Sequence, residues 1–122
     1  IACTLSHFKA LQTFLNDTSN QDAMAIIAED DLSFDFVKYW SQDLNDYIRD
    51  LTTQDPQWEI FKLCVHGGGT PFSLTNSPGV WSTAAHIITR SAASKLVNRH
   101  VHDGKFIFYD HKSWLMLRFM IT

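Results

Sequence analysis

One stretch decides how this chain folds: Met24-Ala25-Ile26-Ile27-Ala28-Glu29-Asp30-Asp31. Its first five residues are an unbroken apolar run, which is typical of a strand buried on both faces of a sheet that helices cover. Three carboxylates follow at once, so the chain leaves the apolar layer at Glu29. In an open α/β sheet, ligands usually bind beyond the carboxyl ends of the strands. The stretch therefore predicts a buried strand over 24–28, with the acidic triplet Glu29-Asp30-Asp31 at a ligand-binding edge.

Helical patterns lie on both sides of this strand. Apolar residues recur at steps of three and four over residues 5–15, and a polar loop over 16–20 ends that helix. A second apolar stripe over 35–51 predicts another helix, with Asp35 placed to favour its N-terminus electrostatically.

The rest of the chain continues the alternation of strands and helices. The predicted elements are a strand over 58–65, a sharp loop at Gly67-Gly68-Gly69, a strand over 80–88, a helix capped by Ser91 and ending near Arg99, a turn over 100–104, a strand over 106–109 and a helix from Lys112 onward. This order favours an α/β fold with a layered sheet and helices on both faces. We expect one domain over residues 1–122, because a chain of this length supports one hydrophobic core.

Composition excludes several classes of protein. Apolar residues make up 45% of the chain and the net charge is −3, so it resembles a globular protein and offers no basic stripe for nucleic acid. Cys3 and Cys64 could be a reduced pair or form one bridge. There is no signal-peptide pattern and no apolar run of roughly 18 residues, so we expect a soluble protein without a transmembrane segment. Because the chain opens at Ile1 without Met and stops at Thr122 without a polar tail, we expect an excerpt of a longer protein.

The acidic triplet has two interpretations. Mg²⁺ and Mn²⁺ prefer hard oxygen ligands, and Mg²⁺ typically takes one or two carboxylates together with substrate phosphates. A bound cation would also remove the repulsion among three adjacent negative charges. The alternative is a solvated acidic turn in which Asp31 or Asp35 caps the next helix. The position of the triplet, directly after an apolar strand, favours a site.

Four segments, in order along the chain, resemble glycosyltransferase family 25, which includes lipooligosaccharide and collagen galactosyltransferases. Residues 2–10 are similar to the family's G-C-x-x-S-H-x-x-A helix start, and residues 26–31 to its apolar run followed by E-D-D. Residues 83–93 resemble its G-T-A-x-Y-x-I-S-R-x-x-A segment, and Tyr109-Asp110 with Leu115-Met116 resembles its late aspartate. The resemblance extends over nearly the whole chain.

The resemblance implies a GT-A-type fold and a metal-dependent, inverting transfer of a sugar. The donor would be a UDP-sugar, usually UDP-galactose, and the acceptor a glycan, a lipooligosaccharide or a glycoprotein. By position, Asp31 would bind Mn²⁺ or Mg²⁺ together with Glu29, while Glu29 and Asp30 orient the nucleotide sugar. Asp110 would be the general base that takes the proton of the acceptor hydroxyl.

Other residues are candidates for substrate binding. Ser6 and His7 begin a helix whose N-terminus attracts anions, although His7 could equally be a partly buried structural histidine. Trp81 could stack on a base or sugar, and Thr83 belongs to the third matching segment. His66 could touch the nucleotide or acceptor, but a histidine beside glycines is more often simply exposed.

Some residues are better explained without a site. His100, His102 and Asp103 do not form a zinc-binding pattern, because zinc needs three or four converging ligands. Trp40 and Trp58, like Trp114, are expected to be core aromatics.

The chain also departs from the family pattern. Nothing before Ile1 represents the family's first strand and arginine-containing segment, and Ser82 and His86 stand where glycine and tyrosine are usual. These departures favour a second hypothesis, a non-catalytic binding or assembly module with the same fold, and a metal-dependent phosphohydrolase is a third. We expect a cytoplasmic or membrane-peripheral location, or the lumen of the endoplasmic reticulum for a eukaryotic protein.

Overall fold

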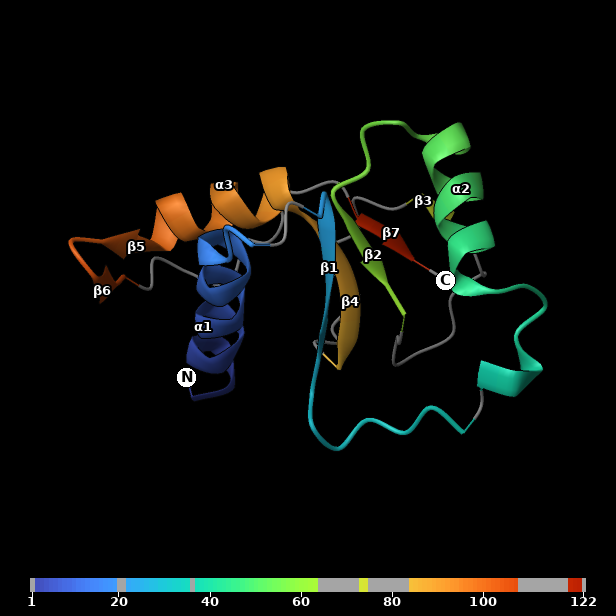
Figure 1. Ribbon diagram of the computed structural model, residues 1–122, viewed down its shortest axis with the longest axis horizontal. Coiled ribbons are helices and arrows are strands. Elements are labelled where there is room, and N and C mark those ends of the chain that lie inside the picture. The colour runs from blue at the N-terminus through green and yellow to red at the C-terminus, as the bar shows by residue number, and fades with distance from the viewer. Residues whose placement is uncertain are drawn as a thin grey trace.

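A computed structural model describes residues 2–19, 22–35, 37–63, 73–74, 84–107 and 119–121. Over these residues the chain is a small α/β fold in which helices pack on a mostly antiparallel sheet (Figure 1). The helices are α1 (Ala2–Asn16), the 3₁₀ helix η1 (Val37–Tyr39), α2 (Leu44–Gln54) and α3 (Arg90–His100). The strands are β1 (Met24–Ala28), β2 (Ile60–Lys62), β3 (Ser73–Leu74), β4 (Ala85–Thr89), β5 (Val101–His102), β6 (Lys105–Phe106) and β7 (Phe119–Ile121).

The main sheet is mixed. Its described strands lie in the order β1-β4-β2-β7-β3; β4 pairs antiparallel with both β1 and β2, while β7 runs parallel to β2 and antiparallel to β3. Because β1 and β4 are antiparallel, Ala28 at the carboxyl end of β1 lies opposite Ala85 at the amino end of β4. The acidic triplet thus leaves the sheet beside the start of its neighbouring strand.

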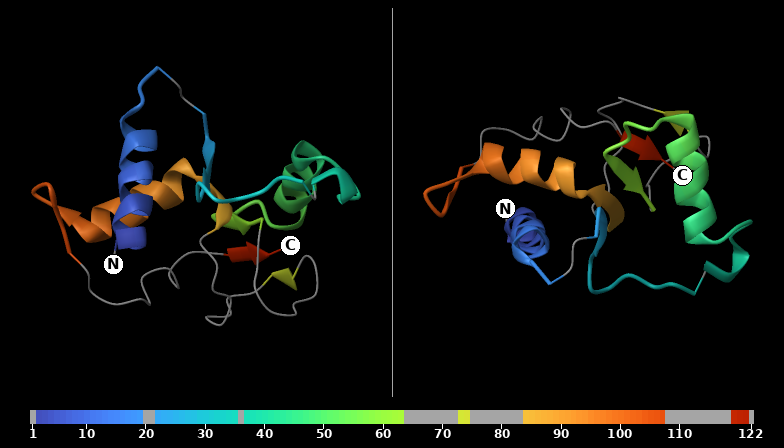
Figure 2. Two further views of the ribbon diagram at one scale, coloured as in Figure 1. Left: turned by 90° about the horizontal axis from the view of Figure 1, so that it is seen from below. Right: turned by 45° about the horizontal axis from the view of Figure 1, so that its top comes forward.

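One face of the sheet is covered by α1 and α3, which cross each other in the view from below (Figure 2). The strand register aligns Ala25, Ile88 and Ile60 across β1, β4 and β2, so their side chains share a face. Ile60 and Ile88 are at most 1% exposed and belong to one core cluster with residues of both helices: Phe8, Leu11, Ala92, Ala93 and Leu96.

The opposite face is covered by α2. Phe61 and Ile87, which are paired neighbours in β2 and β4, form a second core cluster with Tyr47, Leu51 and Trp58. Trp58 is therefore a core aromatic, as expected, and Trp40 packs partly buried against the same cluster. Successive residues of each strand therefore face opposite sides of the sheet, one set packing beneath α1 and α3 and the other beneath α2.

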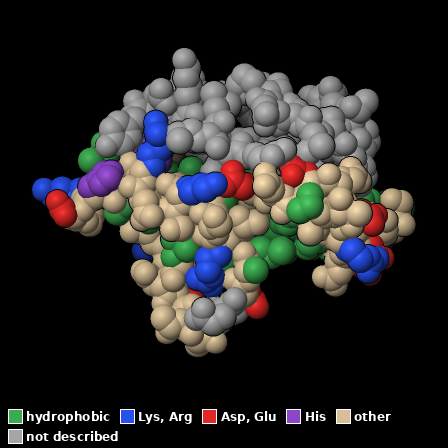
Figure 3. Space-filling view, turned by 90° about the horizontal axis from the view of Figure 1, so that it is seen from above, with side chains coloured by type: hydrophobic (Ala, Val, Ile, Leu, Met, Phe, Trp, Pro, Cys, Tyr) green, Lys and Arg blue, Asp and Glu red, His purple; other side chains and the backbone are tan. Residues whose placement is uncertain are grey.

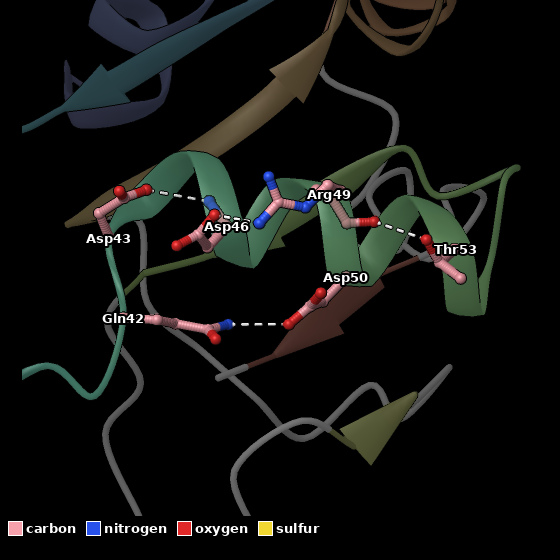
Figure 4. Close-up of polar contacts among 6 residues, drawn as sticks. All are labelled: Gln42, Asp43, Asp46, Arg49, Asp50 and Thr53. Atoms are coloured by element: carbon pink, nitrogen blue, oxygen red, sulfur yellow. Dashed lines mark hydrogen bonds and ion pairs between the residues drawn. The ribbon is translucent and has the colours of Figure 1, made fainter.

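The start of α2 differs from the sequence prediction. Asp43 has φ −74° and ψ 166°, and its carboxylate accepts the backbone N–H of Asp46 at 3.0 Å (Figure 4). Arg49 pairs with Asp46 within the helix, and the Gln42 amide donates to Asp50 at 3.1 Å. The predicted helix over 35–51 is wrong at both ends, because Asp43 and not Asp35 occupies the capping position and the helix continues to Gln54.

The start of α3 also needs correction. Its N-cap is Thr89, whose hydroxyl accepts the backbone N–H of Ala92 at 3.2 Å, and not Ser91, which lies inside the first turn. β2 is shorter than the predicted strand over 58–65, whereas β4 runs one residue beyond the predicted end at 88; residues 64–65 and 80–83 lie outside the described residues.

The C-terminal predictions were wrong where the structure describes them. Of the strand predicted over 106–109, Phe106 does lie in a strand, but that strand is β6, which pairs with β5 in a small separate hairpin and not with the main sheet. Ile107 lies beyond β6, and residues 108–109 lie outside the described residues. The turn of the hairpin contains Asp103 and Gly104 at φ 50° and 72°. Residues 119–121, expected to continue a helix from Lys112, form β7 instead. A short apolar run fits a buried strand as well as a helix, and its pairing with β2 decides the outcome.

The burial predicted for β1 was also wrong. The strand has the expected bounds, but Ile27 is 9% exposed while its neighbour Ile26 is 51% exposed. Ile27 faces the core beneath α1, and β1 pairs with β4 alone among the described strands. Ile26 faces the opposite side of the sheet, where it lines a hollow and is not part of the cluster beneath α2.

Candidate functional site

The acidic triplet forms a turn at the end of β1. The backbone N–H of Glu29 donates to the carbonyl of Ala84 at 2.8 Å, which extends the pairing of β1 with β4 by one residue. The Leu32 N–H then reaches the Glu29 carbonyl at 3.4 Å and closes the turn. Asp30 and Asp31 are exposed, and Glu29 is half-buried. The sheet therefore fixes Glu29, and the two aspartates project from the turn that follows it.

His7 approaches this turn from α1. Its side chain is 6% exposed, and Nε2 lies 3.6 Å from the Glu29 Oε1 atom. The imidazole stacks on that of His86 in β4, with ring centroids 5.8 Å apart and an angle of 24° between the rings. Two elements, α1 and β4, thus hold His7 against the carboxylate that ends β1.

These residues line a hollow of about 440 Å³. Its lining residues come from the second and third turns of α1 and from the end of β1 with the acidic turn: Ser6, His7, Ala10, Ile27, Ala28, Glu29, Asp30 and Asp31. We call this hollow the acidic pocket. Three of these lining residues are carboxylic acids and none is a lysine or arginine. The pocket therefore attracts cations and groups that donate hydrogen bonds, and repels an anion that arrives without a counterion.

A polar row continues from the pocket across the sheet. The register places Ile27, His86 and Lys62 side by side in β1, β4 and β2, so all three share the face covered by α1. Burial lowers the pKa of the Lys62 ammonium below its usual value. Sequence reasoning noted His86 only as a departure from a family pattern and missed Lys62. A charged residue inside the apolar run Ile60-Phe61-Lys62-Leu63 was the available signal.

A second hollow, of about 420 Å³, lies on the other face of the sheet, and we call it the apolar groove. Its lining residues are Ile26, Phe34, Val37, Trp40, Gln42, Asp43, Leu44 and Leu63. Phe34 is 60% exposed and Val37 is 40% exposed. In the view from above, hydrophobic side chains gather in the trough between the side formed by α1 and α3 and the side formed by α2 (Figure 3).

The structure brings together five of the residues predicted for the site. Ser6, His7, Glu29, Asp30 and Asp31, from two segments far apart in the sequence, all line the acidic pocket. The other predicted residues lie outside the described residues: His66, Trp81, Thr83 and Asp110. The side chains of Cys3 and Cys64 are not described either.

The described residues were compared with the ligand sets that proteins use to bind metals. Within the described residues, no group of three His, Cys, Asp or Glu side chains could hold a metal ion. His100, one of the three residues considered for zinc, lies in the core. His100 is 2% exposed, its Nδ1 lies 2.8 Å from the Ile107 carbonyl, and its ring packs against Phe8 and Phe106.

Comparison with models of protein families, with curated proteins and with solved structures gave no match to this chain. Among the described helices, none has both the length and the apolar character needed to cross a membrane.

Proposed function

We propose that this chain belongs to a metal-dependent glycosyltransferase with a GT-A-type fold. It would move a sugar, galactose by resemblance to glycosyltransferase family 25, from a UDP-sugar to a glycan, lipooligosaccharide or glycoprotein acceptor. One observation carries the proposal. The Ser6-His7 segment and the Glu29-Asp30-Asp31 segment, each of which resembles a different motif of that family, line the same pocket. In a solvated acidic turn that only ends a strand, we would not expect a buried histidine 3.6 Å from one of the carboxylates.

The chemistry of the pocket fits a hard divalent cation. All three carboxylates are oxygen donors, the type that Mg²⁺ and Mn²⁺ prefer. Since three protein ligands do not converge among the described residues, Asp31 and Glu29 would supply one or two ligands, and diphosphate and water the others. Such an ion would neutralise the charge that develops on the leaving diphosphate. The negative charge of the pocket is consistent with this role, because it disfavours a diphosphate that lacks a cation.

The transfer is an inverting displacement. The acceptor hydroxyl oxygen forms a bond to the anomeric carbon, the bond from that carbon to the diphosphate oxygen breaks, and its electron pair leaves with UDP. The hydroxyl proton passes to a carboxylate base, for which Asp110 is our candidate from the sequence. A correctly placed general base contributes roughly 10²- to 10⁴-fold to such a step.

Calorimetric titration of the full chain with UDP, with and without Mn²⁺, tests the proposal. We expect UDP to bind only with Mn²⁺, and Asp31→Asn to weaken that binding at least tenfold. Asp35→Asn removes an equal charge from an exposed position outside the pocket lining and serves as the control. The proposal fails if the unaltered protein shows no Mn²⁺-dependent binding of UDP, or if Asp31→Asn binds as well as Asp35→Asn.

A non-catalytic binding module with the same fold is the second candidate. Ser82, which stands where glycine is usual in glycosyltransferase family 25, favours it. Binding of glycans or UDP that is indifferent to Mn²⁺, without transfer from any UDP-sugar, would support this module. Release of phosphate from simple esters would instead support a metal-dependent phosphohydrolase.

A further inference from the structure

The pairing of His7 with Glu29 has a definite geometry. His7 Nε2 faces Glu29 Oε1 at 3.6 Å, slightly longer than a formed hydrogen bond. Contacts of this kind often shorten when a ligand binds. Glu29 is held by its own backbone bond to Ala84. The distance can therefore close by a small movement of either side chain, without a change in the fold.

The surroundings of His7 favour one tautomer. A neutral imidazole carries one N–H donor and one acceptor nitrogen. Nδ1 of His7 is buried and has no hydrogen-bond partner in the described part of the chain. Nε2 faces a carboxylate, which only accepts when ionised. The proton is thus best placed on Nε2, where it points at Glu29. A second proton, on Nδ1, would be buried without an acceptor.

His86 limits how far His7 can turn. The two rings are stacked, and His86 is 3% exposed and fixed in β4 between β1 and β2. A histidine confined in this way acts as a fixed donor. An exposed histidine would lose conformational freedom each time it engaged Glu29.

We propose that His7 is a positioning residue that aims the Glu29 carboxylate into the acidic pocket through its Nε2–H group. This inference rests on the proposed function, because the task that Glu29 is positioned for is cation binding. Groups that orient a ligating carboxylate generally affect metal affinity roughly 10- to 100-fold when they are removed. His7 therefore raises the affinity of the pocket for the cation without contacting it.

The first test observes His7 directly and requires no metal. Two-bond ¹H–¹⁵N spectra of the ¹⁵N-labelled full chain report which ring nitrogen carries the proton. We expect the Nε2–H tautomer for His7, and a shift of its ring nitrogen signals in Glu29→Leu, which lacks an acceptor. Glu29→Gln keeps an oxygen acceptor and should shift them less. An Nδ1–H tautomer in the unaltered protein would overturn the proposal, whether or not the variants fold.

The second test measures Mn²⁺ affinity in the presence of UDP. Gln and Met side chains have similar lengths, but only Gln carries a terminal N–H donor. We expect His7→Met to weaken Mn²⁺ binding roughly 10-fold or more and His7→Gln to restore most of the loss. His100→Gln alters another buried histidine, far along the chain, and should change stability while leaving Mn²⁺ affinity unchanged.

The two tests separate the inference from the proposed function. If the unaltered protein binds no Mn²⁺, the proposed function fails, and the tautomer of His7 still decides whether His7 donates to Glu29. If Mn²⁺ binds but His7→Met and His7→Gln bind it equally well, the donor has no positioning role and the inference is overturned. Equal losses in His7→Met and His100→Gln would likewise overturn it, because they would indicate a general effect of stability.

Discussion

Arg90 lies over Phe14 and also binds its backbone. The guanidinium carbon is 4.2 Å from the centre of the Phe14 ring, and Nη1 donates to the Phe14 carbonyl at 3.1 Å. Nε of Arg90 donates to the Asp22 carbonyl at 3.0 Å. One side chain thus joins the start of α3 to the end of α1 and to the loop before β1.

We expect Arg90→Met to destabilise the fold by about 2 kcal/mol, because the carbonyls at the end of α1 lose a charged donor and Phe14 loses a cation–π contact. Arg90→Lys should lose about half as much, since a single ammonium cannot reach both sites. Urea denaturation measures the difference. The exposed Lys105→Met is the control, and equal stability of Arg90→Met and Lys105→Met would contradict the structure.

Leu51 anchors α2 to the sheet. It is fully buried in the cluster that contains Phe61 and Ile87. We expect Leu51→Ala to lower the free energy of unfolding by about 2–5 kcal/mol, through lost burial and the cavity that remains. The same change at Leu5, which is 43% exposed, should cost far less. Thermal and urea denaturation of both variants give the comparison, and similar losses would show that α2 is packed differently.

Thr89 is expected to stabilise the start of α3 through its hydroxyl group alone. Thr89→Val keeps the shape but removes the acceptor for the Ala92 N–H, so we expect a loss of about 1 kcal/mol. Thr89→Ser should retain the cap. Amide hydrogen exchange locates the effect, which should be greatest in the first turn of α3. Unchanged protection of the Ala92 amide in Thr89→Val would rule out the cap.

Lys62 should give stability a characteristic dependence on pH. Burial lowers its folded-state pKa below the ordinary value of 10.5, so between those two values the unfolded chain binds more protons. The free energy of unfolding should therefore rise with pH in that interval, and the penalty for burying the charged amine is fully present below it. Lys62→Met removes the penalty, so its advantage over the unaltered protein should be greatest near neutral pH.

That advantage should shrink as the pH approaches 10.5. Urea denaturation of both proteins at a series of pH values from neutral upward measures it. A difference in stability that stays constant over the whole series would mean that the Lys62 amine does not titrate differently in the folded state.

The sequence predicted the local features of the fold well. The bounds of β1 follow from an apolar run that ends abruptly at an acid, and spacing predicts the helix over 5–15. The prediction that Ser6 and His7 begin this helix was wrong, because α1 begins at Ala2 and both residues lie in its second turn. The ends of α2 and α3 were missed, because several residues near each start could cap and only the structure shows which one does. Asp35 and Asp43 are chemically equivalent caps, and only Asp43 reaches a helical N–H.

The position of the acids in the candidate site could be predicted from the sequence, but the contacts between its residues could not. Placing the acids at a strand end needed only the order of residues, whereas the contact of His7 with Glu29 depends on how α1 crosses the sheet. The burial of β1 was mispredicted because it depends on which helices cover each face of the strand: Ile27 packs in the cluster beneath α1, and Ile26 is absent from the cluster beneath α2. The alignment of His86 with Lys62 depends on the pairing register of β2 with β4, and a shift of one residue would move Lys62 to the other face.

The place of β1 at the end of the described strand order gives the acidic triplet a second physical effect. None of the described strands other than β4 pairs with β1, which also carries the exposed Ile26, and charges beside such an edge oppose the addition of another chain. If the β1 strands of two copies paired antiparallel, the acidic triplet of each copy would lie beside the β1 strand of the other. If they paired parallel, the two triplets would lie side by side. The same three acids that line the pocket therefore also place negative charge beside an edge where another strand could add.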